Sequence, residues 1–82
     1  MPHVVAADAD FRARAGGLAE LDIEADTYAG LIDALDRRFP GLGDHVRRRM
    51  AVAIDGVIHQ DPGPLPLSPT SEVCLIPRIG GG

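Results

Sequence analysis

The sequence predicts a small α+β domain in which one main helix packs against one face of a β-sheet of four to five strands. Two observations predict this fold class. A stretch with helical periodicity, residues 27–39, lies between short stretches whose apolar residues alternate or cluster as they do in strands. The chain has 82 residues, of which 45% are hydrophobic, and this suits a single domain with a single core.

The N-terminal part of the chain predicts a strand, a loop and a second strand. Residues 3–7 form an apolar run, and residues 18–26 alternate between apolar and acidic side chains, as in a strand with one buried face. Residues 8–17 mix charged side chains with alanine and end on Gly16 and Gly17, so we expect a loop there.

The helix is predicted to begin after Thr27, with Asp26 as the alternative N-cap. It is predicted to end before Pro40, because the residue before a proline avoids helical geometry. Gly30 lowers the helix propensity by about 1 kcal/mol relative to alanine, which indicates close packing or simple tolerance. The apolar residues at helical spacing are Tyr28, Leu31, Ile32, Leu35 and Phe39.

The next part of the chain predicts a connector and a hairpin. Residues 41–49 are interpreted as a connector with at most one helical turn. Residues 50–54 and 57–59 are predicted to be strands. They are joined at Asp55 and Gly56, a dipeptide typical of tight hairpins.

The last strand is predicted at residues 72–76, after a proline-rich surface loop (residues 61–69) from which Leu65 and Leu67 are expected to reach the core. If this strand returns to the centre of the sheet beside the first strand, the fold is a β-grasp, as in ubiquitin. Alternation within the strand decides which side chains face the helix. We expect the inward residues to be Val73 and Leu75, and the residues on the open face to be Cys74 and Ile76.

The end of the chain predicts a functional tail. We assign residues 1–77 to the β-grasp domain and residues 78–82 to a flexible C-terminal tail. Pro77 has no N–H and a fixed φ, so it is expected to take the chain out of the sheet. The three terminal glycines bury no side chain and lose much backbone entropy on ordering, so fold stability does not explain them. They predict a thin arm that carries the unhindered carboxylate of Gly82 into a narrow channel.

Side chains near the tail are candidates for binding a partner. Arg78 and Ile79 precede Gly80 and offer one cationic and one apolar contact. Ile76 is either an isolated apolar residue on the surface or, with Cys74 and Ala51 or Ala53, part of a docking patch. The glycine tail itself could alternatively be an unstructured end or a cloning remnant.

The composition limits which classes of function are expected. The formal charge is −4, so nucleic acid is not an expected partner. All eight basic residues are arginine, so no lysine side chain is present for acylation, although a GC-rich genome would explain this equally well. The single cysteine fits a reducing compartment, and neither a membrane span nor a leader is predicted, so we expect a cytoplasmic protein.

For the histidines, the cysteine and the basic run, a structural interpretation is simpler than a functional site. The three histidines, His3, His45 and His59, show no spacing typical of metal ligands, so no metal site is predicted. Cys74 in mid-strand is interpreted as a small apolar residue rather than a reactive thiol. The basic run at residues 47–49 could attract an acidic partner or a nucleotide, but a solvated connector is the favoured interpretation.

Three motifs carry a family resemblance. Residues 27–31 are similar to a threonine-capped helix start, residues 52–56 to a V-x-V-N-G hairpin with Asp in place of Asn, and residues 72–77 to an E-V-x-hydrophobic-hydrophobic-P ending before Gly81 and Gly82. With these motifs the chain resembles the MoaD/ThiS family of ubiquitin-like sulfur-carrier proteins over essentially its full length.

The chain departs from the family pattern at three places. Residues 69–71 stand where a Gly-Asp or Asp-Gly pair is usual, residues 7–12 lack the usual aromatic and Leu-Arg pattern, and the end carries three glycines instead of two. The sulfur-carrier interpretation survives these departures. Because of these departures, the motifs do not identify the pathway that the carrier would serve.

The resemblance implies a carrier rather than an independent enzyme. An adenylating enzyme of the ubiquitin-activating type would use Mg-ATP to activate the carboxylate of Gly82, next to Gly81. A sulfur donor would then form a thiocarboxylate, which a sulfur-accepting synthase subunit would consume. No cofactor is expected to bind to the chain itself, and no membrane is an expected partner.

Several alternatives remain open on the sequence. The carrier could be the small subunit of a molybdopterin synthase, or serve thiamin, cysteine or a specialised sulfur metabolite. A second class is a ubiquitin-like modifier joined through Gly82 to lysines of other proteins. A third is a β-grasp interaction module without tail chemistry.

Overall fold

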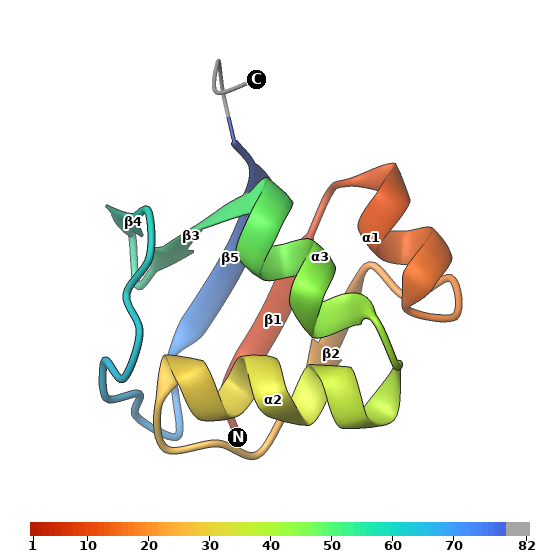
Figure 1. Cartoon of the computed structure of the whole chain (residues 1–82). Helices are drawn as coiled ribbons and strands as arrows, with labels where there is room; N and C mark the ends of the chain where they lie inside the picture. Colours follow the sequence, from red (N-terminus) through yellow and green to blue (C-terminus); the bar gives the residue numbers. More distant parts are fainter. Residues whose placement is uncertain (79–82) are drawn as a thin grey trace.

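A computed structural model gives the structure of the chain and describes residues 1–78 (Figure 1). The elements in chain order are β1 (His3–Ala6), α1 (Ala9–Arg14), β2 (Glu20–Asp22), α2 (Tyr28–Arg38), α3 (Leu42–Arg49), β3 (Met50–Ile54), β4 (Val57–His59) and β5 (Glu72–Pro77). The three helices lie over one face of the sheet, and we call the opposite face the open face.

The strand order is β2-β1-β5-β3-β4. β5 therefore lies in the centre of the sheet, parallel to β1 and antiparallel to β3. The outer pairs, β1 with β2 and β3 with β4, are both antiparallel. This mixed sheet with helices on one face is a β-grasp fold, so the predicted fold class and the predicted return of the last strand beside the first are confirmed.

The core lies between the sheet and the helices. Val73 and Leu75 of β5 are fully buried and Cys74 is exposed, so the predicted faces of this strand are confirmed. Leu65 and Leu67 pack against the core from the proline-rich loop, as expected. Large side chains that are almost completely buried include Val4, Phe11, Leu31, Ile32, Leu35, Leu42, Val46, Met50 and Val52.

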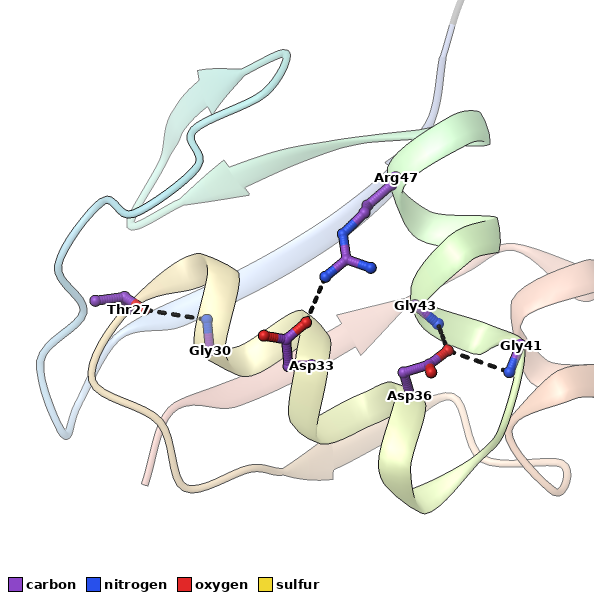
Figure 2. Close-up of polar contacts among 7 residues, drawn as sticks. All are labelled: Thr27, Gly30, Asp33, Asp36, Gly41, Gly43 and Arg47. Atoms are coloured by element: carbon purple, nitrogen blue, oxygen red, sulfur yellow. Dashed lines mark hydrogen bonds and ion pairs between the residues drawn. The ribbon is translucent and has the colours of Figure 1, made fainter.

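The local signals at α2 and at the β3–β4 hairpin predict the structure correctly. The Thr27 hydroxyl oxygen accepts a hydrogen bond from the Gly30 N–H at 3.0 Å, which caps the start of α2 (Figure 2). The helix ends at Arg38, two residues before Pro40. Asp55 and Gly56 have φ values of 49° and 85°, as a two-residue hairpin turn of type I′ requires.

The loop predicted at residues 8–17 is wrong, because α1 occupies its middle. A carboxylate oxygen of Asp8 accepts a hydrogen bond from the Phe11 N–H at 3.1 Å and caps this short helix. The Phe11 side chain is fully buried in the core. A six-residue helix with one large apolar residue is too short to show helical periodicity in the sequence.

The connector predicted at residues 41–49 is also wrong, because α3 fills nearly all of it. Leu42 and Val46, one turn apart, are fully buried. The helix has no N-cap side chain of its own. Instead, Asp36 of α2 accepts hydrogen bonds from the N–H groups of Gly41 (3.1 Å) and Gly43 (2.9 Å), as Figure 2 shows. The cap therefore comes from another helix, which a local sequence signal does not reveal.

The bounds of three strands differ from the predictions. β1 ends at Ala6, one residue earlier than predicted. β2 is shorter at both ends than the predicted strand at residues 18–26, and it ends at Asp22 because its partner β1 begins only at His3. Ile23 is nevertheless buried, and its N–H donates to the Pro2 carbonyl at 3.0 Å just beyond the strand. β5 runs one residue further than predicted, because Pro77 still pairs with Met50 as the last residue of the strand.

Candidate functional site

The predicted site lies at the end of β5, where the chain leaves the sheet (Figure 1). β5 is paired with β1 as far as Leu75, and its last two residues, Ile76 and Pro77, are paired with β3. The predicted site residues Ile79, Gly80, Gly81 and Gly82 lie outside the described residues. Ile76 and Arg78 are the two predicted site residues that the structure places.

Arg78 binds to its own domain. Its N–H donates to the Arg49 carbonyl at 2.9 Å, and its Nε donates to the Met50 carbonyl at 3.2 Å. Its Nη2 donates to the carbonyls of Arg47 at 3.1 Å and Gln60 at 3.2 Å. The guanidinium predicted to contact a partner is thus engaged within the chain.

Ile76 lies half-buried on the open face, opposite Ala51 of β3. The next row across this face is in register on four strands: Val5, Cys74, Ala53 and Ile58. Residues directly opposite in neighbouring strands share one face of the sheet. We call Ile76 and these four residues the open-face patch.

The open-face patch is accessible and apolar. Ile58 is 66% exposed and Cys74 is an exposed free cysteine, whereas Ala51 is only 4% exposed and contributes little. Ile76 shares its face with a row of small and apolar side chains, and this favours the docking patch over an isolated apolar residue. This arrangement suits the docking of a partner close to the tail.

An acidic group of residues borders the patch at the far end from the tail. His3 Nδ1 lies 2.9 Å from Asp22 Oδ1, and His3 Nε2 lies 3.1 Å from Glu20 Oε1. The hydrogen bond with Asp22 is the main cause that raises the pKa of His3 above its ordinary value of 6.5. Loss of hydration opposes it as the second-largest effect, and Glu20 and the nearby Glu72 add to the rise. The sequence pattern did not indicate this cluster, because the residues come from three different strands.

A polar pocket of about 400 Å³ lies between α1 and α3, beside the end of β5. Its lining residues are Asp8, Asp10, Arg14, His45, Arg49 and Pro77. Within it, His45 Nε2 lies 3.3 Å from Asp8 Oδ2. The sequence interpretation missed this pocket, because both helices that form it were predicted as loop or connector.

The described part of the chain offers neither a metal cluster nor a membrane span. Residues 1–78 contain no group of three or more His, Cys, Asp or Glu side chains arranged to hold a metal ion. None of the helices in these residues is both long and apolar enough to cross a membrane.

Comparison with known proteins identifies relatives of this fold. Residues 9–82 match the model of the ThiS family. No curated protein matches the chain. Three solved structures have a similar backbone fold. Their sequence identities to this chain are low, so the similarity establishes the fold alone.

One is the crystal structure of Mycobacterium tuberculosis CysO, with a TM-score of 0.82, 16% identity, and coverage of 96% of this chain and 100% of that chain. A second is the Amycolatopsis orientalis BexX/CysO complex, with a TM-score of 0.83, 16% identity and full coverage of both chains, 100% and 100%. A third is the solution structure of small archaeal modifier protein 1 from Methanosarcina acetivorans, with a TM-score of 0.78, 20% identity, and coverage of 99% and 95%.

Proposed function

The chain belongs to the ThiS family, and from this premise we propose that it is a sulfur carrier whose Gly82 carboxylate is converted to a thiocarboxylate. The observation that carries the proposal is the extent of the family match, which runs through the terminal glycines to residue 82. The central position of β5 supports it, because the strand stays paired with β3 as far as Pro77 and so presents the start of the tail on an ordered element.

The proposed chemistry uses the tail as a substrate of other proteins. A Gly82 carboxylate oxygen attacks the α-phosphate of Mg-ATP on an adenylating enzyme, and pyrophosphate leaves. The resulting mixed anhydride is attacked at its carbonyl carbon by hydrosulfide or by a donor persulfide, and AMP leaves. With a persulfide, a thiol then cleaves the S–S bond and releases the thiocarboxylate. A carboxylate needs this activation because it is a poor electrophile.

The chain contributes binding and delivery to this cycle. Gly80, Gly81 and Gly82 have no side chains to crowd the attacking sulfur, and Ile79 offers an apolar contact just before them. The open-face patch is the proposed docking surface, because exposed apolar residues gathered on one face and close to the tail suit a partner interface. No general base or metal is required from the carrier, so it acts as a co-substrate and not as an enzyme.

Intact-protein mass spectrometry tests the proposal. We expect the chain, incubated with its adenylating enzyme, Mg-ATP and a sulfur source, to exchange one oxygen for one sulfur. A variant without Gly81 and Gly82 is the matched control and is expected to keep its mass, because deletion of Gly82 alone would leave a two-glycine ending. An unchanged mass of the full chain, with an enzyme shown to be active on another carrier, would contradict the proposal and favour an interaction module without tail chemistry.

A second candidate is a protein modifier. The similarity of fold to a small archaeal modifier protein is the observation that favours it. In this function the activated Gly82 would be joined to lysine side chains of other proteins. The absence of lysine from the chain argues against chains of linked copies but permits single attachment. Adducts of higher mass on a denaturing blot, lost when Gly81 and Gly82 are deleted, would distinguish this function.

The acceptor of the sulfur defines the pathway. A chain of this fold is found with BexX in the Amycolatopsis complex, so a second protein that binds the carrier is a reasonable partner here. Candidates are a synthase subunit for molybdopterin, in which this chain would be the small subunit, or an enzyme of thiamin, cysteine or specialised sulfur metabolism. We propose the cytoplasm as the compartment, since ATP and reduced sulfur donors are available there.

A further inference from the structure

Arg78 is the first residue after β5 and the last residue that the structure describes. Its N–H donates to the Arg49 carbonyl at 2.9 Å. Its guanidinium donates to three further carbonyl oxygens, at 3.1 Å for Arg47 and at 3.2 Å for both Met50 and Gln60. The backbone and the side chain of one residue thus bind four carbonyls of the same chain.

Two of these carbonyls lie in α3, one lies in β3 and one directly follows β4. Arg47 and Arg49 lie in the last turn of α3, where the final carbonyls of a helix lack intrahelical partners. A cation is favoured there, because the C-terminal end of the helix dipole is negative. Met50 begins β3, and Gln60 directly follows β4. Arg78 therefore joins the end of β5 to the ends of α3 and β4 and the start of β3.

The geometry uses the shape of arginine. Nε donates to Met50, and Nη2 donates to Arg47 and Gln60, so three of the five N–H donors of the guanidinium are engaged within the chain. A planar guanidinium holds these donors in a rigid fork. The ammonium of a lysine concentrates its donors on one atom and does not reproduce this arrangement.

We propose that Arg78 is a positioning residue for the tail: an internal anchor that sets where and in which direction the chain leaves the sheet before residues 79–82. Its effect on activation rests on the proposed function, because accurate delivery of Gly82 matters only if Gly82 is activated. An unanchored start of the tail samples more directions, and its entry into a narrow channel then loses more conformational entropy. Whether Arg78 holds the end of β5 does not depend on the proposed function.

The experiment compares Arg78→Ala and Arg78→Lys with a control, Arg37→Ala. Arg37 is an exposed arginine in the last turn of α2 whose side chain makes no hydrogen bond or ion pair within residues 1–78. The first readout is hydrogen exchange of the backbone amide at position 78 in the carrier alone, measured by NMR. Because hydrogen bonds from charged donors are comparatively strong, we expect exchange of this amide to rise about tenfold in both variants at position 78 and to stay unchanged in the control.

The second readout is the rate of adenylation by the cognate enzyme. We expect both variants at position 78 to lower kcat about tenfold with little change in KM, because the domain still docks but the carboxylate is misplaced. A partner contact made by charge would instead raise KM in Arg78→Ala and be rescued by Arg78→Lys, and this result would overturn the proposal. Unchanged amide exchange would also overturn it.

Failure of the proposed function gives a different pattern. If the wild-type chain is not adenylated, the sulfur-carrier proposal fails, while the exchange measurement still decides whether Arg78 is an anchor. If exchange rises but adenylation of the variants equals that of the wild type, the anchor exists without positioning the tail, and the inference is overturned.

Discussion

Gly43 of α3 lies directly against Asp36 of α2. Its N–H donates to Asp36 Oδ1 at 2.9 Å, and a Cβ added at Gly43 would lie only 2.8 Å from the Asp36 Cβ. Glycine is therefore required for the close approach of the two helices. The contact also explains how α3 begins without a capping side chain of its own.

Gly43→Ala is expected to destabilise the fold by about 1–2 kcal/mol, because overpacking at the α2–α3 contact outweighs the gain in helix propensity. Chemical denaturation measures the change. Gly30→Ala is the comparator, since a Cβ there meets only the Thr27 Oγ1, at 3.1 Å. We expect that variant to stay within about 1 kcal/mol of the wild type. Equal stabilities for both variants would contradict the role assigned to Gly43.

The pKa of His3 predicts a pH dependence of stability. Because the folded-state pKa is raised, mainly by the hydrogen bond with Asp22, protonated His3 stabilises the folded chain. This contribution is complete below the ordinary pKa of 6.5 and is lost as the pH rises through the raised value. The difference in unfolding free energy between the wild type and His3→Gln should therefore shrink in that window.

Replacing the main partner of His3 is a second check. NMR titration of the His3 ring in Asp22→Asn should show a lower pKa than in the wild type, because the hydrogen bond to a carboxylate is gone. Glu20 and Glu72 remain and keep part of the effect. The same His3 pKa in both proteins would show that Asp22 is not the main cause.

Tyr28 is expected to titrate only at very alkaline pH. Burial, assisted by Asp61 and opposed by Arg47 and Arg78, raises its pKa from 10.0 to about 12. The chain has one tyrosine and no tryptophan, so tyrosinate absorbance reports this group alone. The stability that the protonated phenol contributes is complete below pH 10.0 and is lost as the pH rises through about 12.

Unfolding provides the reference for this titration. In denaturant the tyrosine should titrate near its ordinary pKa of 10.0, and Tyr28→Phe should show no such absorbance change. If the folded and unfolded chains titrate together, the hydroxyl of Tyr28 is not shielded from water.

Two neighbouring residues of β4, one isoleucine and one valine, allow a test of the proposed docking surface. Ile58 and Val57 are both exposed, at 66% and 58%, but lie on opposite faces of β4. Ile58→Ser is expected to weaken binding to the adenylating partner about tenfold, because it removes the largest exposed apolar side chain of the open-face patch. Val57→Ser is the matched control, with the same loss of strand propensity on the other face. Calorimetric titration measures both affinities.

Both variants should keep stabilities close to the wild type, because the side chains are exposed. An equal loss of affinity in the two would place the partner around the edge of β4 rather than on the open face. No loss in either would exclude Ile58 from the interface.

The sequence predicts correctly those features whose signals act over only a few residues. The Thr27 cap, the Pro40 stop and the Asp55-Gly56 turn each act within a few residues, so α2 and the β3–β4 hairpin are predicted correctly. The inward positions Val73 and Leu75 follow from alternation alone. Predicting these features requires no information about the rest of the chain.

The candidate site is predicted less completely. The open-face position of Ile76 follows from strand alternation, but the row from Val5 to Ile58 depends on the register of four strands. The pocket at His45 depends on two helices that are too short, or too poor in apolar residues, to show a periodic pattern. Arg78 was predicted to contact a partner because it is a cationic residue just before the glycines. Its contacts within the chain could not be predicted, because its acceptors are backbone carbonyls, which a sequence does not mark.

By itself, the sequence determined the fold class and the faces of the last strand, because hydrophobic period and turn chemistry are local properties of the chain. The carrier chemistry of the glycine ending was implied by the resemblance to the MoaD/ThiS family and stays a proposal. Only the tertiary structure decided which distant groups meet. Asp36 caps α3 across a helix–helix contact, Asp22 holds His3 across two strands, and Arg78 binds the end of α3. Each of these contacts joins residues that the folded backbone, and not their spacing in the chain, brings within hydrogen-bonding distance.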